Sequence, residues 1–220
     1  MSIKYIEQQV KMNPFWNNAI REDNLAALTL ETAYQDNRAA LSIAEMTNLF
    51  KGVVRTQNIP GDIAEVGVYK GGGSKIIARA RQTDKHLYLF DSFEGLPEVS
   101  TQDPGLEVGQ MAVSFENVQD YLQEIPNKTF IKGMFPQTAE LLPSQEMKFS
   151  FVHLDMDTYQ STLEGLKYFY PRMSKGGFIL MHDYNSISCR GVQKAVDEFF
   201  FDKPDPLIEL FHTQILCVKF

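Results

Sequence analysis

The stretch FVHLDMDTY, residues 151–159, closes an apolar run with two aspartates, Asp155 and Asp157. Acidic side chains at the end of a buried strand can hold a metal ion, act as a base, or bind the sugar of a nucleotide. Asp157 or Thr158 could also simply cap the helix that is predicted to follow. The chemistry of the two acids therefore depends on which other side chains lie near them.

A second polar pair, His182 and Asp183, ends the apolar run GGFILMHD, residues 176–183. Adjacent parallel strands lie about 4.8 Å apart, so Asp155 and Asp183 could share one cation. Carboxylate oxygens suit Mg²⁺ or Mn²⁺, whereas a nitrogen ligand from His182 favours Mn²⁺, Fe²⁺ or Zn²⁺. His182 could equally point away from such a site, and His153 inside the strand is typical of a packed core histidine.

The stretch EVGVYKGGGS, residues 65–74, runs from a predicted strand through glycines into a predicted helix. Glycines let the backbone approach a ligand, and the helix N-terminus offers free N–H groups and a partial positive charge. The spacing acid-x-Gly-x-x-x-Gly, with Glu65, Gly67 and Gly71, is typical of S-adenosylmethionine-dependent methyltransferases. The dinucleotide fingerprint does not fit, because Tyr69 occupies its second glycine position. A tight turn without a ligand is the alternative.

The stretch LYLFDSFEGLPE, residues 87–98, places Asp91 at the end of another predicted strand. A carboxylate there can accept hydrogen bonds from both hydroxyls of a ribose, as in other nucleotide-binding folds. The alternative is an aspartate that only starts a turn, which aspartate often does. Because the glycine motif precedes it, we favour ribose binding.

Short apolar runs that predict strands alternate with longer stretches of helical periodicity. The predicted strands are 62–68, 86–91, 128–133, 149–155 and 176–183. The predicted helices are 43–58, 74–82, 115–125, 136–142, 161–173 and 191–201. This alternation predicts an α/β fold with a mostly parallel sheet, helices on both faces and an antiparallel edge from 207–220. Ligands of such sheets bind beyond the carboxyl ends of the strands, where the acids and glycines above are placed.

Composition narrows the class of protein. We expect the 220 residues to form one domain, 1–220, with a helical cover over 1–40 and the core over 41–220. The 21 basic and 28 acidic residues give a net charge of −7, which argues against a nucleic-acid partner. Two cysteines are too few for a disulfide framework and indicate a reduced, cytoplasmic setting. The chain shows neither a signal peptide nor the ~20 apolar residues of a membrane span.

Several motifs together resemble one family. In order and spacing, the motifs of this chain resemble those of the macrocin O-methyltransferase family, whose members methylate sugar hydroxyls of macrolide and aminocoumarin antibiotics. The stretches that carry the resemblance are IPGDIAEVGVYKGGGSKIIA, LYLFDSFEGLPE, IKGMFPQT, HLDMDTYQSTLEGLKYFYPRMSKGGFILMHDY and CRGVQKAVDEF. The similarity covers roughly residues 40–200. It implies a Rossmann-like class I methyltransferase fold, S-adenosylmethionine as methyl donor, and a divalent metal, usually Mg²⁺ with Mn²⁺ as the other candidate.

The resemblance also implies roles for individual residues. Asp155, His182 and Asp183 correspond to the metal ligands, and Asp157 corresponds to the catalytic base. The antibiotic enzymes have an aspartate at the position of His182, so whether His182 binds the metal or acts as a catalytic base stays open. The implied cofactor-binding residues are Glu65, Gly67, Gly71, Gly72, Ser74, Asp91, Ser92, Phe93, Gly133, Phe135 and Asp155.

Two other functions remain open from the residues alone. An Asp-x-Asp glycosyltransferase would explain Asp155 and Asp157 but not the glycine motif. A cofactor-binding protein with altered catalysis would explain His182. For the methyltransferase, the expected acceptor is a small-molecule glycoside or a sugar, and the expected assembly is a homodimer. We expect the polar loop 100–111 and residues 1–40 to cover the acceptor.

Overall fold

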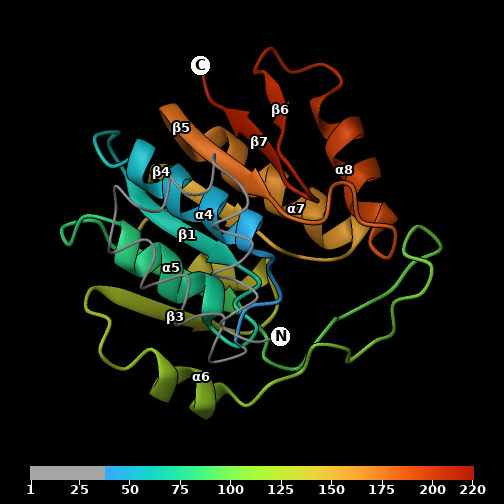
Figure 1. Ribbon diagram of the computed structural model, residues 1–220, viewed down its shortest axis with the longest axis horizontal. Helices are drawn as coiled ribbons and strands as arrows, with labels where there is room; N and C mark the ends of the chain where they lie inside the picture. The colour runs from blue at the N-terminus through green and yellow to red at the C-terminus, as the bar shows by residue number, and fades with distance from the viewer. Residues whose placement is uncertain (1–37) are drawn as a thin grey trace, which may run out of the picture.

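Seven strands form one sheet in the order β3-β2-β1-β4-β5-β7-β6 (Figure 1). Strands β1 to β5 run parallel, and β7 and β6 extend the sheet as an antiparallel edge, which confirms the predicted arrangement. The strands are β1 Asp62–Val66, β2 Leu87–Asp91, β3 Lys128–Lys132, β4 Phe149–Leu154, β5 Met173–Met181, β6 Leu207–Glu209 and β7 Ile215–Val218.

The computed structural model describes residues 38–220. The helical cover predicted for 1–40 therefore lies almost wholly outside the described residues. The single domain over 1–220 and the homodimer stay predictions. Over residues 38–220, no helix is both long enough and apolar enough to cross a membrane.

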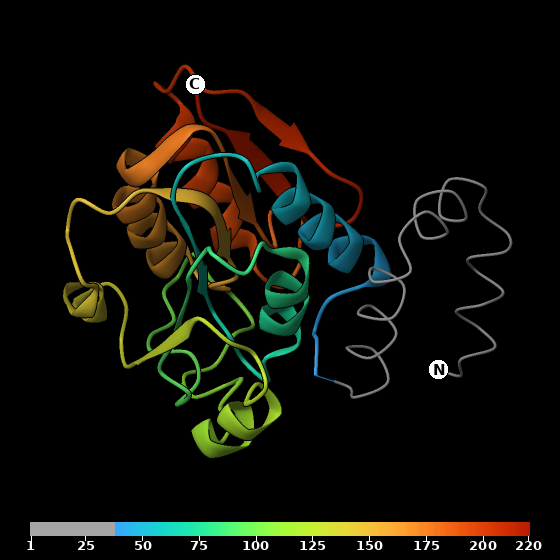
Figure 2. The same ribbon diagram turned by 90° about the vertical axis from the view of Figure 1, so that its left-hand side faces the viewer.

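Helices cover both faces of the sheet. Figure 2 shows α4 and α5, in blue and blue-green, on one side of the strands, and α7 and α8, in brown and orange, on the other. The helices are α4 Ile43–Arg55, α5 Gly72–Ala80, α6 Phe115–Tyr121, η1 Gln137–Leu141, α7 Tyr159–Phe169, η2 Tyr170–Arg172 and α8 Arg190–Phe200.

Alternate side chains of each central strand enter opposite layers of the core, because successive residues of a strand point to opposite faces. Ile63 and Leu89 pack with α4 and α5, whereas Val66, Phe90 and Leu154 pack with α7 and α8. Both faces are buried, so the strands appear in the sequence as nearly continuous apolar runs. This is why β1, β2, β4 and the apolar half of β5 could be located from the sequence, whereas β3, KTFIK, lies at the edge of the sheet and is only partly buried.

Local chemistry explains where the elements begin and end. The spacing Ser-x-x-Glu at residues 42–45 predicts a capping box at the start of α4, and the structure has it, with Ser42 and Glu45 bonded reciprocally. Helix α7 begins at Tyr159, two residues before its predicted start, because the Thr158 hydroxyl accepts from the Ser161 N–H and caps it. The α-helix gives way to the 3₁₀ turn η2 at Pro171, which cannot donate to the preceding turn. Strand β5 then starts at Met173 rather than at 176.

The strand order reverses beside β1, where the chain places β2 and β3 on one side and β4 and β5 on the other. Open α/β sheets bind their ligands at this switch point, outside the carboxyl ends of the strands. The turns that leave β1, β2, β4 and β5 form one rim there. The candidate site must be sought on this rim.

Candidate active site

One cavity of about 290 Å³ opens at this rim. Most residues predicted from the sequence to form the site line it together: Glu65, Gly67, Asp91, Ser92, Gly133, Phe135, Asp155, Asp157, His182 and Asp183. Four predicted cofactor residues are not among its lining: Gly71, Gly72, Ser74 and Phe93. Gly71 is the N-cap of α5, Gly72 and Ser74 lie in its first turn, and Phe93 lies in the turn after β2.

The turn between β1 and α5 is built around two glycines with left-handed backbone. Gly67 has φ +91°, and a Cβ on it would lie 1.8 Å from the carbonyl oxygen of Asp155. Gly71 has φ +84° and is the N-cap of α5, where no side chain caps the first N–H groups. Free N–H groups at a helix N-terminus attract anions, so this end of α5 suits a carboxylate or phosphate.

Glu65 lies at the base of the cavity wall, beneath the glycine turn, and is only 1% exposed. Its two carboxylate oxygens accept hydrogen bonds from the hydroxyl of Ser74 and from Nδ1 of His153, the latter at 3.0 Å. Burial raises the pKa of Glu65. Glu65 therefore ties α5 to β1 and β4, and His153 is the buried, hydrogen-bonded core histidine that the sequence suggested.

Asp91 braces the turns that follow β1 and β2. One carboxylate oxygen accepts from the backbone N–H groups of Val68 and Tyr69, both at 2.8 Å, and the other accepts from Phe93 at 2.7 Å. Burial nevertheless raises the pKa of Asp91. Its carboxylate still forms part of the cavity lining, where the predicted ribose site lies.

Backbone strain is concentrated on the rim. Four residues other than glycine that directly follow or lie just beyond the strands have positive φ: Tyr69 at 49°, Phe93 at 61°, Asp157 at 60° and Asp183 at 64°. Such conformations cost about 1–3 kcal/mol each and persist where the surroundings impose them, typically at functional sites. No sequence signal marks these positions.

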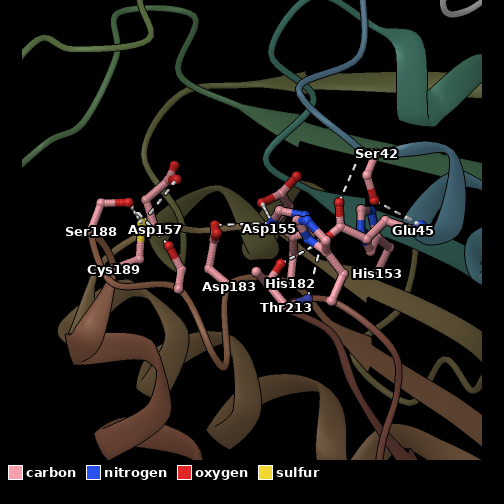
Figure 3. A network of polar contacts seen from close by, with 12 residues as sticks. Ser42, Glu45, His153, Asp155, Asp157, His182, Asp183, Ser188, Cys189 and Thr213 are labelled. Carbon is pink, nitrogen blue, oxygen red and sulfur yellow. Dashed lines mark hydrogen bonds and ion pairs between the residues drawn. The ribbon is translucent and has the colours of Figure 1, made fainter. Parts of the chain in front are cut away.

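His182 lies at the centre of a cluster of acids that Figure 3 shows as a row of side chains running from Cys189 to Ser42. Its Nδ1 is 3.2 Å from Oδ1 of Asp155 and 3.0 Å from Oδ2 of Asp183. Its Nε2 is 3.2 Å from Oε1 of Glu45. Neither ring nitrogen makes a hydrogen bond of good geometry, although the side chain is only 9% exposed.

The cluster shifts the titration of its members. Burial opposes a positive charge on His182, but the carboxylates around the ring outweigh it and raise the pKa of His182 well above its ordinary value. Burial would raise the pKa of Asp155, but the neighbouring His182 lowers it below its ordinary value. The site therefore favours one positive charge between Asp155 and Asp183.

Asp157 stands apart from this pairing. Burial raises its pKa, and the charges of Asp155 and Asp183 raise it further. The thiol of Cys189 lies 3.9 Å from its Oδ1, and Thr158, not Asp157, caps α7. The Asp157 carboxylate is thus left in the cavity with a raised basicity.

The residues around Nδ1 of His182 fit a divalent ion. Ligand atoms of Asp155, His182 and Asp183 all lie within 4.8 Å of one another. Two carboxylates converge on a buried nitrogen that has no well-formed hydrogen bond, which is an arrangement that a cation satisfies. The nitrogen makes the set more typical of Mn²⁺, Fe²⁺ or Zn²⁺ than of Mg²⁺.

The long loop between β2 and α6 closes one side of the cavity. It contributes Leu96, Leu106 and Met111 to the lining. That the segment 100–111 covers the acceptor stays a prediction. Asp103, only 2% exposed, anchors it by accepting from the N–H of Tyr159 at 2.7 Å, at the start of α7. In Figure 1 this loop, in green, extends from the α6 side of the molecule toward α8.

Three residues of the site were missed by sequence reasoning. The sequence around Glu45 indicates only its capping role. Nothing near Cys189 or Asp103 in the sequence indicates a place at the site. The contacts that bring them to the site join residues far apart in the chain, such as Cys189 with Asp157 and Glu45 with His182. Such contacts become visible only when the sheet brings the segments together.

A profile of the family described as Macrocin-O-methyltransferase (TylF) matches residues 39–210, which include every rim residue described above. The chain belongs to this family. Membership confirms the resemblance of the motifs and the prediction of an S-adenosylmethionine-dependent O-methyltransferase at the level of the family. The family also leaves the glycosyltransferase alternative without support.

Individual relatives agree with the family. The chain is 31% identical over 180 residues to the 8-demethyl-8-(2,3-dimethoxy-alpha-L-rhamnosyl)-tetracenomycin-C 4'-O-methyltransferase of Streptomyces olivaceus, covering 74% of this chain and 67% of the relative. It is 32% identical over 173 residues to the demethyldecarbamoylnovobiocin O-methyltransferase of Streptomyces niveus, covering 70% and 64%. The chain thus spans about two thirds of the length of these relatives.

The fold has close counterparts among solved structures. The O-methyltransferase NovP superposes with a TM-score of 0.73 at 28% identity, over 83% of this chain and 82% of that one. The calicheamicin methyltransferase CalS11 superposes with a TM-score of 0.68 at 18% identity, over 94% and 93%. These similarities confirm the class I methyltransferase fold predicted from the motifs.

Proposed function

We propose that this protein transfers the methyl group of S-adenosylmethionine to a hydroxyl of a sugar on a small-molecule glycoside. The observation that carries the proposal is the meeting of three features in one cavity: the glycine turn before α5, the Asp91 carboxylate, and the acids Asp155, Asp157 and Asp183. The first two suit a nucleoside with a charged tail. The third suits a hydroxyl that must lose a proton.

The donor would lie along the turns after β1, β2 and β3. Asp91 would bind the ribose, Gly133 and Phe135 would flank the base, and the start of α5, which no side chain caps, would face the carboxylate of the methionine part; Asp91, Gly133 and Phe135 all line the cavity. Gly133 has φ +133°, which brings its backbone close to the cavity without a side chain. When bound, the donor supplies a methyl carbon activated by its sulfonium.

Asp157 would receive the proton of the acceptor hydroxyl. Its carboxylate is in the cavity, and burial beside Asp155 and Asp183 raises its pKa toward the range in which a general base is effective. The left-handed backbone at Asp157 turns the chain away from β4 immediately before α7 begins. This geometry gives the base a defined position relative to the sheet.

Asp155, His182 and Asp183 would hold a divalent ion next to Asp157. Bound there, such an ion would supply positive charge that lowers the pKa of a nearby hydroxyl. The protein's part is to set two carboxylates and one imidazole around one point and to keep that point partly shielded from water. The same three side chains also orient the acceptor if they contact vicinal hydroxyls.

The acceptor class follows from the relatives and the cavity. The relative from Streptomyces olivaceus is named for a rhamnosyl-bearing substrate. In this chain the cavity lining contains the acids of the site and also the apolar side chains of Leu96, Leu106, Met111 and Met156. A sugar joined to a less polar body would satisfy both kinds of side chain.

A methyl-transfer assay tests the proposal. The full chain is incubated with methyl-labelled S-adenosylmethionine, a panel of rhamnosides and related glycosides, and Mg²⁺, Mn²⁺ or EDTA. We expect labelled methyl ether on a sugar, with one S-adenosylhomocysteine formed per product. Binding of S-adenosylhomocysteine without methylation of any glycoside would instead favour a cofactor-binding protein with altered catalysis.

A further inference from the structure

Glu45 connects three parts of the protein through one carboxylate. It lies in the first turn of α4 and is 2% exposed. Its Oε2 accepts from the N–H of Ser42 at 2.8 Å, as part of the capping box. Its Oε1 accepts from Nδ1 of His212 at 2.9 Å and from the hydroxyl of Thr213, in the hairpin between β6 and β7, and lies 3.2 Å from Nε2 of His182.

These contacts make the two nitrogens of His182 unequal. Nε2 faces Glu45, whereas Nδ1 faces both Asp155 and Asp183. In an imidazole that binds metal, a hydrogen bond from one nitrogen to a carboxylate fixes the tautomer and aims the other nitrogen at the ion. Glu45 lies 3.2 Å from Nε2, although not in good hydrogen-bond geometry here, and is therefore placed to be that carboxylate.

Nδ1 makes no hydrogen bond of good geometry in this arrangement. Its neighbours are two carboxylates at 3.0 and 3.2 Å, and the side chain is only 9% exposed. A single positive particle between Nδ1 and the two oxygens satisfies all three groups. A proton or a metal ion can occupy that place.

We propose that Glu45 is a positioning residue that holds His182 with Nε2 protonated and Nδ1 turned inward, so that the site takes an ion of the Mn²⁺, Fe²⁺ or Zn²⁺ class in preference to Mg²⁺. This inference rests on the proposed function. Mg²⁺ demands oxygen ligands and loses its waters reluctantly, whereas imidazole nitrogen suits the transition metals. A histidine at position 182, where the antibiotic enzymes have an aspartate, would thus change which metal ion the site prefers.

The first experiment measures ion preference without turnover. Free Mn²⁺ is counted by electron paramagnetic resonance as the full chain is titrated, and Mg²⁺ is then added as competitor. We expect Mn²⁺ to be preferred by at least about 10-fold in the wild-type protein. His182→Asp, which leaves an all-oxygen set, should bring the two affinities within a few-fold of each other. Equal affinities in the wild type would overturn the proposal.

The second experiment isolates Glu45. Glu45→Met should weaken Mn²⁺ binding by about 10–100-fold, the usual effect of removing an outer hydrogen-bond partner of a metal ligand. Ser42→Ala and Thr213→Val are matched controls, since each removes a hydroxyl that contacts Glu45 while leaving the carboxylate on His182. The controls should keep wild-type affinity. If all three variants weaken Mn²⁺ binding equally, Glu45 is only a structural residue.

A third measurement reads the orientation directly and does not depend on Glu45 variants folding. In the Zn²⁺-loaded, ¹⁵N-histidine-labelled protein, with His182→Asp used to assign the signal, we expect Nε2 protonated and Nδ1 bound to the ion. Coordination through Nε2 would contradict the inference. Methylation of glycosides together with Mg²⁺-preferring or metal-free behaviour would overturn this inference alone. Absence of methylation would count against the proposed function.

Discussion

The backbone of Gly67 packs directly on the backbone of Asp155: a Cβ at position 67 would lie 1.8 Å from the Asp155 carbonyl oxygen. The two residues follow the neighbouring strands β1 and β4, and the Asp155 N–H donates to the carbonyl of Val66 at 2.9 Å. The glycine turn and the acidic turn are therefore one packed unit. A shift of one of these two turns must therefore move the other.

Gly67→Ala should disrupt this unit. The substitution adds a clash to the cost of positive φ, so we expect a loss of unfolding free energy above the 1–2 kcal/mol typical of a left-handed alanine. Gly105→Ala is the matched control, because Gly105 has φ +97° and nothing within 4 Å of its Cβ position. Urea denaturation compares the two. Equal losses would mean that the contact with Asp155 is relieved at no cost.

Asp157→Asn tests the base. Loss of general-base catalysis typically costs ~10²–10⁴ in rate, and we expect kcat to fall by this amount while S-adenosylhomocysteine binding is unchanged. Because the pKa of Asp157 is raised by burial and by its acidic neighbours, the wild-type rate should climb with pH through a value above that of an ordinary aspartate. The variant should lack this limb. Cys189→Ser, which alters a polar contact of Asp157, is the control expected to retain it.

His182→Gln tests the buried charge. It leaves Glu45 and Asp155 without their cation, and breaking a buried pair in this way costs about 3–5 kcal/mol. His212→Gln is the matched control, because His212 contacts the same Glu45 oxygen but is 51% exposed, so its loss should cost no more than about 1 kcal/mol. Urea denaturation in EDTA at pH 7 measures both.

The loss of unfolding free energy in His182→Gln should depend on pH in a defined direction. The raised pKa of His182 gives stability that is complete below about pH 6.5 and is lost as pH rises toward the folded-state value. The lowered pKa values of Glu45 and Asp155 give stability that is present above their ordinary values and is lost as pH falls. The wild type should therefore lose stability from pH 6 to pH 3. Acid protonates the uncompensated carboxylates of His182→Gln, so its deficit should shrink over this range; a constant deficit would contradict the ionic account.

Asp103→Ala tests the loop as part of the acceptor site. The buried carboxylate ties the loop to Tyr159, so its loss should raise the acceptor KM while leaving the affinity for S-adenosylhomocysteine unchanged. Gln102→Ala is the adjacent control, since Gln102 makes only an exposed contact with Lys194. Initial rates over a range of acceptor concentrations measure the effect. A matching loss of donor affinity would mean that the loop supports the whole rim.

Sequence reasoning succeeded where the chemistry is local. The capping box of Ser42 and Glu45, the glycine turn, and the buried strands each leave a pattern within a few residues. It also grouped the polar ends of the strands correctly, because parallel strands present their carboxyl ends at one edge of the sheet.

The remaining features depend on contacts between distant segments. Nothing near Glu45 indicates that its carboxylate meets His182 and the β6–β7 hairpin, because that meeting requires α4 to pack across β5 and β7. Likewise, the sequence predicted that Asp91 binds a ribose, but it did not predict the three backbone N–H groups that donate to its carboxylate. Those groups come from two separate turns. Helix α4 thus has a role at the site that its capping pattern conceals.

Stability and the proposed activity make opposite demands on the residues of the rim that have a left-handed backbone. Asp157 and Asp183 carry acids in a backbone conformation that glycine or asparagine would adopt with less strain. A selection for heat resistance alone would therefore reward replacement of the residues proposed to do the chemistry. Thermostable variants gained at these two positions should be the inactive ones, and a library intended to keep activity should hold both positions constant.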